Sequence, residues 1–225
     1  MLTTLRAKLR LLMRFGSIVR HNPRRQVAQV LARERPIKLH LGCGSDYLPG
    51  YVNLDVNPNV RADLHMRVED LCFFPPDIVD AMESYHFFEH LSPQDARAAL
   101  KEWFRILKPG GVVVLELPNL EVCIREMGKH FDQNGIDLAM VGIYGYAPDI
   151  VEGGVWQMHK WGWTPETLRS ELEAVGFSHV ARHPIRQTWR PAAQFNRDMQ
   201  IRAIKSSGPR RVEYLVERVP HGIQR

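Results

Sequence analysis

The sequence has few of the features that mark several classes of protein. Its 225 residues include only three cysteines, Cys43, Cys72 and Cys123, and none of them forms a CxxC pair. No set of cysteines and histidines has the spacing of a zinc site, so we expect no metal site and a reducing compartment. No apolar run approaches the roughly 18 residues of a membrane span. The first residues lack the pattern of a signal peptide. These absences predict a cytoplasmic protein.

Positive charge is concentrated at one end of the chain. The net charge is +5, but residues 1–35 hold nine Lys and Arg against one acid, which gives +8 and leaves −3 for the remainder. Leucines and arginines recur at helical spacing there, so residues 1–36 are expected to form a basic amphipathic helical arm. Such an arm can pack, self-associate or contact an anionic membrane surface. The mildly acidic remainder makes a nucleic-acid partner unlikely on charge grounds.

Predicted strands and helices alternate after this arm. The alternation indicates an α/β fold with a doubly wound, mostly parallel, seven-stranded Rossmann-like sheet over residues 37–204. Residues 119–163 are expected to form a substrate-side insertion or lid, and residues 205–225 a C-terminal tail. The expected strands are 37–41, 50–56, 60–66, 78–85, 112–117, 177–184 and 198–205, and capping residues followed by proline predict helices at about 23–34, 93–107 and 165–175.

A glycine turn joins the first two predicted strands, in the stretch KLHLGCGSDYLPGYVNLD. Gly42 and Gly44 allow positive φ angles and a close approach of the backbone to a ligand. A dinucleotide site would need a third glycine and an acid about 20 residues further on. Here Tyr47 stands at the third position, and Asp55 follows Gly44 by only 11 residues. Both departures count against NAD, whereas the two oxygens of a carboxylate at the end of the second strand suit a ribose diol.

Four segments in a fixed order carry a family resemblance. They read HLGCGSDYLPGYVNLDVNP, EDLCFFPPDIVDAMESYHFFEHL, LKEWFRILKPGGVVVLELPNLE and HKWGWTPETLRSELEAVGF. The chain resembles class I S-adenosylmethionine-dependent methyltransferases, and is most similar to a small bacterial group in which the helix between the first two strands is reduced to a loop. The resemblance implies that S-adenosyl-L-methionine is the cofactor. It further implies methyl transfer to a small molecule, a sugar or a glycolipid.

The resemblance also implies a set of cofactor-binding residues. Asp55 would hold the ribose, and the glycine turn would line the methionine part. The family commonly has an acid where Arg67 stands. The adenine would therefore be contacted instead by Glu69, by the backbone of Val68 or by Asp63. The expected set is Leu41, Gly42, Cys43, Gly44, Ser45, Asp55, Val68, Glu69 and His86.

Two histidines are candidates for the catalytic base. His86 follows the fourth predicted strand and would lie near the transferred methyl group. His159 lies in the segment HKWGWT, which by resemblance closes over the substrate side, although aromatic neighbours also fit a packing role. A neutral histidine is suited to accept a proton from a hydroxyl near pH 7. Glu89 and His90 are expected only to brace the short helical piece after the fourth strand.

Two other functions stay open on the sequence alone. An NAD(P)-dependent oxidoreductase would use the same fold, and a non-catalytic scaffold or membrane-surface adaptor would keep the fold without the reaction. A nucleic-acid methyltransferase is disfavoured because ESYHFF stands where an Asn/Asp-Pro-Pro-Tyr/Phe signature would follow the fourth strand. The expected partner is therefore a small-molecule or glycan substrate. Residues 1–35 are the part of the chain expected to contact the inner face of the membrane or to self-associate.

Overall fold

The computed structural model describes residues 22–32, 36–186 and 196–206. The first helix expected in the arm and nearly all of the expected tail lie outside these residues. No described helix is both long enough and apolar enough to cross a membrane.

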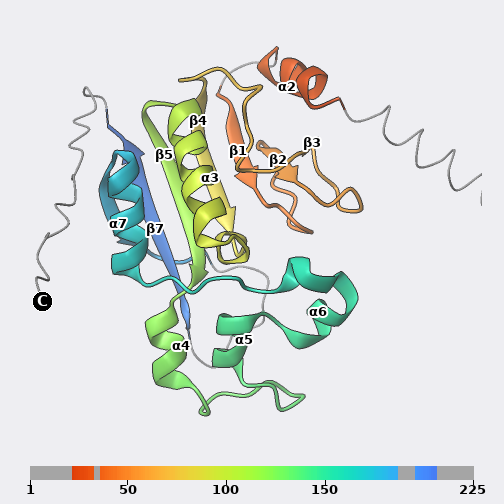
Figure 1. The fold of residues 1–225 in the computed structure, drawn as a ribbon, viewed down its shortest axis with the longest axis vertical. Coiled ribbons are helices and arrows are strands. Elements are labelled where there is room, and N and C mark those ends of the chain that lie inside the picture. Colours follow the sequence, from red (N-terminus) through yellow and green to blue (C-terminus); the bar gives the residue numbers. More distant parts are fainter. Residues whose placement is uncertain (1–21, 33–35, 187–195, 207–225) are drawn as a thin grey trace, which may run out of the picture.

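Seven strands form one sheet in the order β3-β2-β1-β4-β5-β7-β6, as Figure 1 shows in part. The strands β1 to β5 run parallel, whereas β7 is antiparallel to both β5 and β6. This arrangement confirms the predicted mostly parallel, seven-stranded, Rossmann-like sheet. The strands are β1 (Lys38–Leu41), β2 (Val52–Asp55), β3 (Leu64–His65), β4 (Val79–Tyr85), β5 (Leu107–Pro118), β6 (Phe177–His183) and β7 (Asp198–Lys205).

Three helices begin where the sequence predicts, each at a capping side chain followed by proline. The backbone N–H groups of the first turns donate to Asn22, Ser92 and Thr164 at 3.1–3.2 Å, which satisfies amides that have no partner within the helix. The described helices are α2 (Pro23–Leu31), η1 (Phe88–His90), α3 (Pro93–Ile106), α4 (Leu120–Glu126), α5 (Leu138–Tyr144), α6 (Ala147–Gly153), η2 (Gly154–Gln157) and α7 (Pro165–Val175).

Some element boundaries differ from the prediction. Helix α2 ends at Leu31, earlier than the expected end near residue 34. The segment LKPGG was expected to separate α3 from the fifth strand, but β5 already begins at Leu107, which pairs with Val79. The segment between β1 and β2 forms no helix, so the short glycine turn connects the two strands directly.

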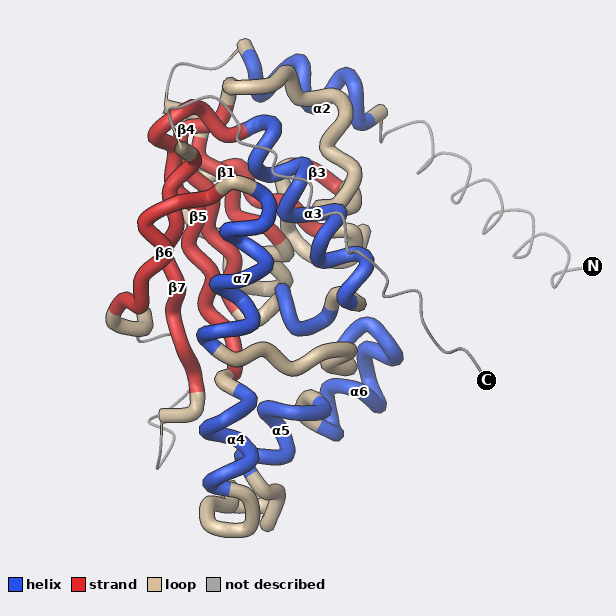
Figure 2. Tube along the Cα trace, turned by 60° about the vertical axis from the view of Figure 1, so that its left-hand side comes forward, coloured by secondary structure: helices blue, strands red, loops and turns tan. Residues whose placement is uncertain are grey.

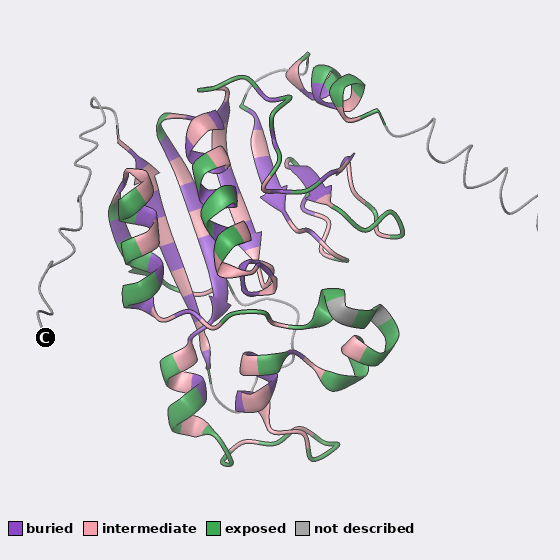
Figure 3. Cartoon of the chain, viewed as in Figure 1, coloured by how far each residue is buried: buried purple, intermediate pink, exposed green. Residues whose placement is uncertain are grey.

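The buried core lies on one face of the sheet, under α3 and α7. Figure 2 shows these two helices on the same side of the strands, and Figure 3 shows buried residues alternating with more exposed ones along the sheet. Val113 is 1% exposed, whereas Val112 and Val114 are only half-buried. Three consecutive valines are typical of a parallel strand that is buried on both faces. Instead burial alternates along β5 from Gly111 to Leu115, and its last residues, 115–118, are all buried. On the neighbouring strand β4, the polar side chains of Glu83 and Tyr85 hydrogen-bond at 2.6 Å.

Residues 119–163 lie beyond the carboxyl end of β5 and carry α4, α5 and α6 (Figure 1). The segment leaves the sheet directly after Pro118 and returns at Trp163, whose carbonyl accepts a hydrogen bond from the Leu120 N–H at 2.9 Å. Because both ends are tied together, the insertion stays next to the edge of the sheet where ligands of doubly wound folds bind.

Candidate functional site

A cavity opens at the carboxyl ends of β1, β2 and β4, where the strand order reverses. Its volume is about 420 Å³, which falls in the range of small-molecule sites. Two of the nine predicted cofactor residues do not line it, because Leu41 and Cys43 are packed in the interior. The seven that do are Gly42, Gly44, Ser45, Asp55, Val68, Glu69 and His86.

The two glycines of the turn have different reasons to be glycine. Gly44 has a φ of +49°, and a Cβ built on it would meet no atom within 4 Å, so its bare face is open to the cavity. Gly42 has a φ of +66°, but a Cβ there would lie 2.0 Å from the ring of Phe87. The absence of a side chain at Gly42 therefore leaves space for the Phe87 ring. The sequence predicted an open backbone face at both glycines, and of the two only Gly44 has one.

Asp55 lies directly beside the glycine turn. Its Oδ2 accepts a hydrogen bond from the Gly44 N–H at 2.8 Å, and its Oδ1 accepts one from the Asn57 N–H at 2.8 Å. A carboxylate offers about four acceptor positions, so each oxygen keeps one for a ligand. The adjacent hydroxyls of a ribose fit this pair. A neighbouring bare backbone face suits the amino-acid limb of S-adenosylmethionine.

Two of the residues expected near adenine, Val68 and Glu69, line the cavity. The carbonyl of Val68 accepts a hydrogen bond from the Trp103 Nε1 at 2.9 Å, and Glu69 is paired with Arg67. Asp63, the third alternative, does not line the cavity. It accepts a hydrogen bond from the Asn53 N–H at 2.8 Å and so braces the loop.

His86 is held between two carboxylates. Its Nδ1 lies 3.5 Å from Glu89 and its Nε2 lies 3.5 Å from Asp198. Burial lowers the pKa of His86, but Asp198 and Glu89 outweigh this effect and raise it to about 10. The ring is therefore charged at neutral pH, which disfavours the predicted role as a proton acceptor and favours a positioning role. Its φ of +48° is unusual for a residue other than glycine.

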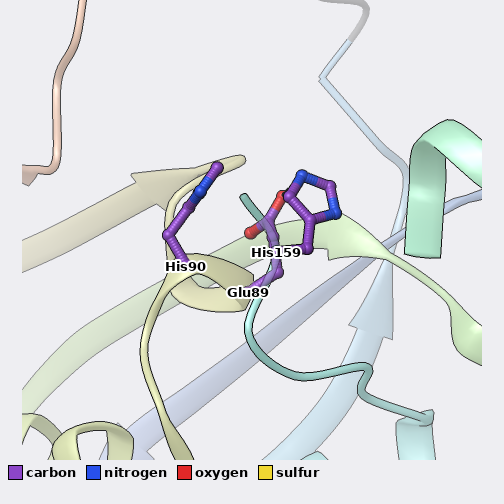
Figure 4. A group of neighbouring side chains, drawn as sticks. All are labelled: Glu89, His90 and His159. Carbon is purple, nitrogen blue, oxygen red and sulfur yellow. Dashed lines mark ion pairs between the residues drawn. The ribbon is translucent and has the colours of Figure 1, made fainter. Parts of the chain in front are cut away.

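Glu89, His90 and His159 form a cluster next to the cavity (Figure 4). The rings of His90 and His159 pack edge to face, with centroids 4.8 Å apart. His90 lines the cavity, whereas His159 does not and lies behind it. Burial lowers the pKa of His159, so this ring is neutral near pH 7.

The pKa of Glu89 is the outcome of opposing effects. Burial raises the pKa of this carboxyl group, but the charged His86 ring, whose Nδ1 lies 3.5 Å away, and the other nearby histidines hold it at about 2. The carboxylate is therefore ionised within a buried cluster. From the sequence, Glu89 and His90 were expected only to brace the short helical piece after the fourth strand. The sequence feature that could have indicated a functional role is an acid and a histidine that follow this predicted strand closely.

The insertion contributes the remaining wall. Trp156, Gln157 and Lys160 line the cavity, and the Lys160 N–H donates to the Glu89 carbonyl at 2.8 Å. Below them, the ring of Phe88 packs against Trp103 and Trp163 with centroids 5.6 and 5.3 Å apart. This packing fixes η1, and with it Glu89 and His90, against the core.

Comparison with known proteins adds family information to this geometry. Residues 39–115, which span β1 to β5 up to Leu115, match a family model described as a methyltransferase domain. A solved S-adenosylmethionine-dependent methyltransferase from Methanosarcina mazei is 17% identical, with 80% of this chain and 97% of that chain covered and a TM-score of 0.52. One from Archaeoglobus fulgidus is 18% identical over 81% of this chain and 90% of its own, with a TM-score of 0.49. No curated protein matches the chain in sequence.

The matched residues include a large part of the cavity lining. The family match covers the glycine turn, Asp55 and His86, and the Methanosarcina mazei protein shares the fold over 80% of this chain. The chain therefore contains a stretch similar to a methyltransferase domain, on a fold that it shares with a solved S-adenosylmethionine-dependent methyltransferase.

Proposed function

We propose that the enzyme methylates a hydroxyl group of a sugar or glycolipid acceptor. The observation that carries the proposal is the mixed lining of the cavity, to which Asp95, Trp156 and Lys160 contribute together with His90. A carboxylate and an ammonium group can hydrogen-bond to sugar hydroxyls, and the indole offers an apolar face to a sugar ring. The lining suits a small, neutral, hydroxyl-rich molecule.

We propose that the cofactor end works as the resemblance implies. The backbone at Gly44 and Ser45 would contact the amino-acid limb, Asp55 would accept hydrogen bonds from the ribose hydroxyls, and Val68 with Glu69 would border the adenine. When bound, S-adenosylmethionine supplies a methyl group made electrophilic by its sulfonium. The protein then has to hold the acceptor oxygen in line with that methyl group, and positioning of this kind contributes on the order of 7–11 kcal/mol.

The two predicted catalytic histidines would have different roles at the acceptor end of the cavity, the part that His90 lines. His86 is charged and contacts Glu89 and Asp198, so it would position the Glu89 carboxylate. His159 donates from Nδ1 to the Gly142 carbonyl at 2.9 Å and stands behind His90. His159 would therefore act on the acceptor through His90, which lines the cavity.

Exposed apolar side chains on the insertion favour a lipid-linked sugar over a free one. Val151 is 85% exposed and Trp156 is 62% exposed, and Met158 and Trp161 are exposed nearby. Exposed apolar groups gathered beside a ligand site mark a surface that binds another apolar surface. A lipid chain attached to the sugar would extend over these residues, and the basic arm of residues 1–36 would add attraction to an anionic membrane.

A methyl-transfer assay with isotopically labelled S-adenosylmethionine tests the proposal. The full chain is incubated separately with free oligosaccharides, with a glycolipid fraction and with RNA, and the label in each product is counted. Label in the glycolipid, and a weaker signal in free oligosaccharide, is the expected result. Asp55→Ala serves as the inactive control. Label that appears only in RNA or in the enzyme itself would contradict the acceptor assignment.

A further inference from the structure

Glu89 presents a buried carboxylate whose hydrogen-bonding capacity is unused. The residue is 2% exposed, and neither of its side-chain oxygens accepts a hydrogen bond from a described residue. Its contacts are the two ion-pair approaches of Oε1, at 3.5 Å to the Nδ1 of His86 and at 3.9 Å to the Nε2 of His159. Burying an ionised carboxylate is costly unless a cation or several donors compensate it. The arrangement therefore leaves room for a further positive partner.

The two neighbouring histidines are oriented in the way that metal ligands require. His90 donates from Nδ1 to the Met158 carbonyl at 3.1 Å, and His159 donates from Nδ1 to the Gly142 carbonyl at 2.9 Å. A carbonyl only accepts, so in each neutral ring the proton is on Nδ1 and the lone pair is on Nε2. Histidines that bind metals commonly fix their tautomer through a backbone carbonyl in this manner.

We propose that Glu89, His90 and His159 bind a divalent transition-metal ion, for which Zn²⁺ is the best match. Figure 4 shows the Glu89 carboxylate between the two imidazole rings. Two imidazole nitrogens and one carboxylate oxygen form a donor set that suits zinc and related metals, whereas Mg²⁺ and Ca²⁺ prefer oxygen ligands alone. Three protein ligands also leave a fourth coordination position open.

The distances allow such a site after a small closure. One ligand atom from each residue lies within 4.8 Å of the other two. In a tetrahedral zinc site, with ligands about 2.0–2.1 Å from the metal, ligand atoms are about 3.4 Å apart. The atoms must therefore approach one another by up to about 1.4 Å, which rotation of the partly exposed His90 side chain can supply. His86 stays on the other side of Glu89, where Asp198 also holds it.

The open position would face the acceptor end of the cavity, because His90 is one of its lining residues. An acceptor oxygen could bind there, and this extension rests on the proposed function, whereas metal binding itself does not. Spacing along the chain could not reveal the site. His159 is separated from His90 by 69 positions, and the insertion brings it back through the Lys160 and Trp161 N–H groups, which donate to the Glu89 carbonyl.

Metal titration of the purified full chain tests the proposal. The protein is stripped with a chelator and titrated with Co²⁺, followed by its visible absorption, and with Zn²⁺ in a calorimeter. We expect one ion per chain, and about 100-fold weaker binding in Glu89→Gln, His90→Ala and His159→Ala. The matched control is His183→Ala, an exposed histidine on β6, which should bind the metal like the wild type.

Titration of the same proteins with S-adenosylhomocysteine separates the two claims. The variants should keep wild-type affinity for it, which also shows that they fold; should Glu89→Gln fail to fold, His90→Ala at the cavity wall decides. Nucleoside binding without stoichiometric metal binding would overturn the metal site alone. Metal binding that Glu89→Gln and His90→Ala leave unchanged would overturn it too. Metal binding without nucleoside binding would instead contradict the proposed function and leave the metal site standing.

Discussion

Asp55 offers the sharpest quantitative prediction. Its two oxygens already accept the Gly44 and Asn57 amides at 2.8 Å, and one acceptor position on each remains for a ribose hydroxyl. A hydrogen bond to a charged group contributes about 1.5–3 kcal/mol, so two of them contribute about 3–6 kcal/mol. Since 1.4 kcal/mol corresponds to a factor of ten, Asp55→Ala should weaken S-adenosylhomocysteine binding by a factor of about 100 to 10,000.

Isothermal titration calorimetry measures this change, with two variants as controls. Asp55→Asn keeps the size and one carbonyl oxygen, so it should fall between wild type and Asp55→Ala. Asp70→Asn removes an exposed carboxylate outside the cavity and should leave the Kd unchanged. Thermal unfolding of each free protein monitors the fold. A folded Asp55→Ala protein with a Kd within threefold of wild type would refute the ribose assignment.

Three further predictions follow from packing and burial. Gly42→Ala should destabilise the fold by about 2–4 kcal/mol in urea unfolding, because its Cβ would lie 2.0 Å from the Phe87 ring. Gly44→Ala should chiefly weaken nucleoside binding. Equal losses of stability in the two variants would contradict this contrast. Phe88→Ala should cost about 3–5 kcal/mol, measured in the same way, and a loss under 1 kcal/mol would show that η1 does not depend on it. Iodoacetamide at pH 7.5 should label Cys72 before the two buried cysteines in mass spectrometry, and earlier labelling of either buried thiol would contradict the burial.

The sequence predicted those parts of the structure that depend on local patterns. Caps followed by proline located the starts of α2, α3 and α7, and the glycine turn and Asp55 were recognised as neighbours that line one cavity. These features depend on hydrogen bonds and backbone angles within a few residues, so they can be recognised without the fold. The early start of β5 was missed because strand pairing with β4 outweighs the turn propensity of proline and glycine.

The acceptor end could not be predicted in the same way. His86 was expected to be a proton acceptor, but its charge depends on Asp198, which follows it by 112 positions and reaches it through the antiparallel strand β7. Glu89 and His90 meet His159 only because the insertion folds back over η1. Contacts between distant segments set pKa values and ligand geometry here, and local patterns carry no information about them.

A crystal structure of the full chain with bound S-adenosylhomocysteine tests the assignment of the cavity. We expect electron density for the nucleoside in the cavity at the ends of β1, β2 and β4, with both ribose hydroxyls within hydrogen-bonding distance of the Asp55 carboxylate and the amino-acid limb against the backbone of Gly44. Density for the ligand at any other place, or a ribose turned away from Asp55, would contradict it.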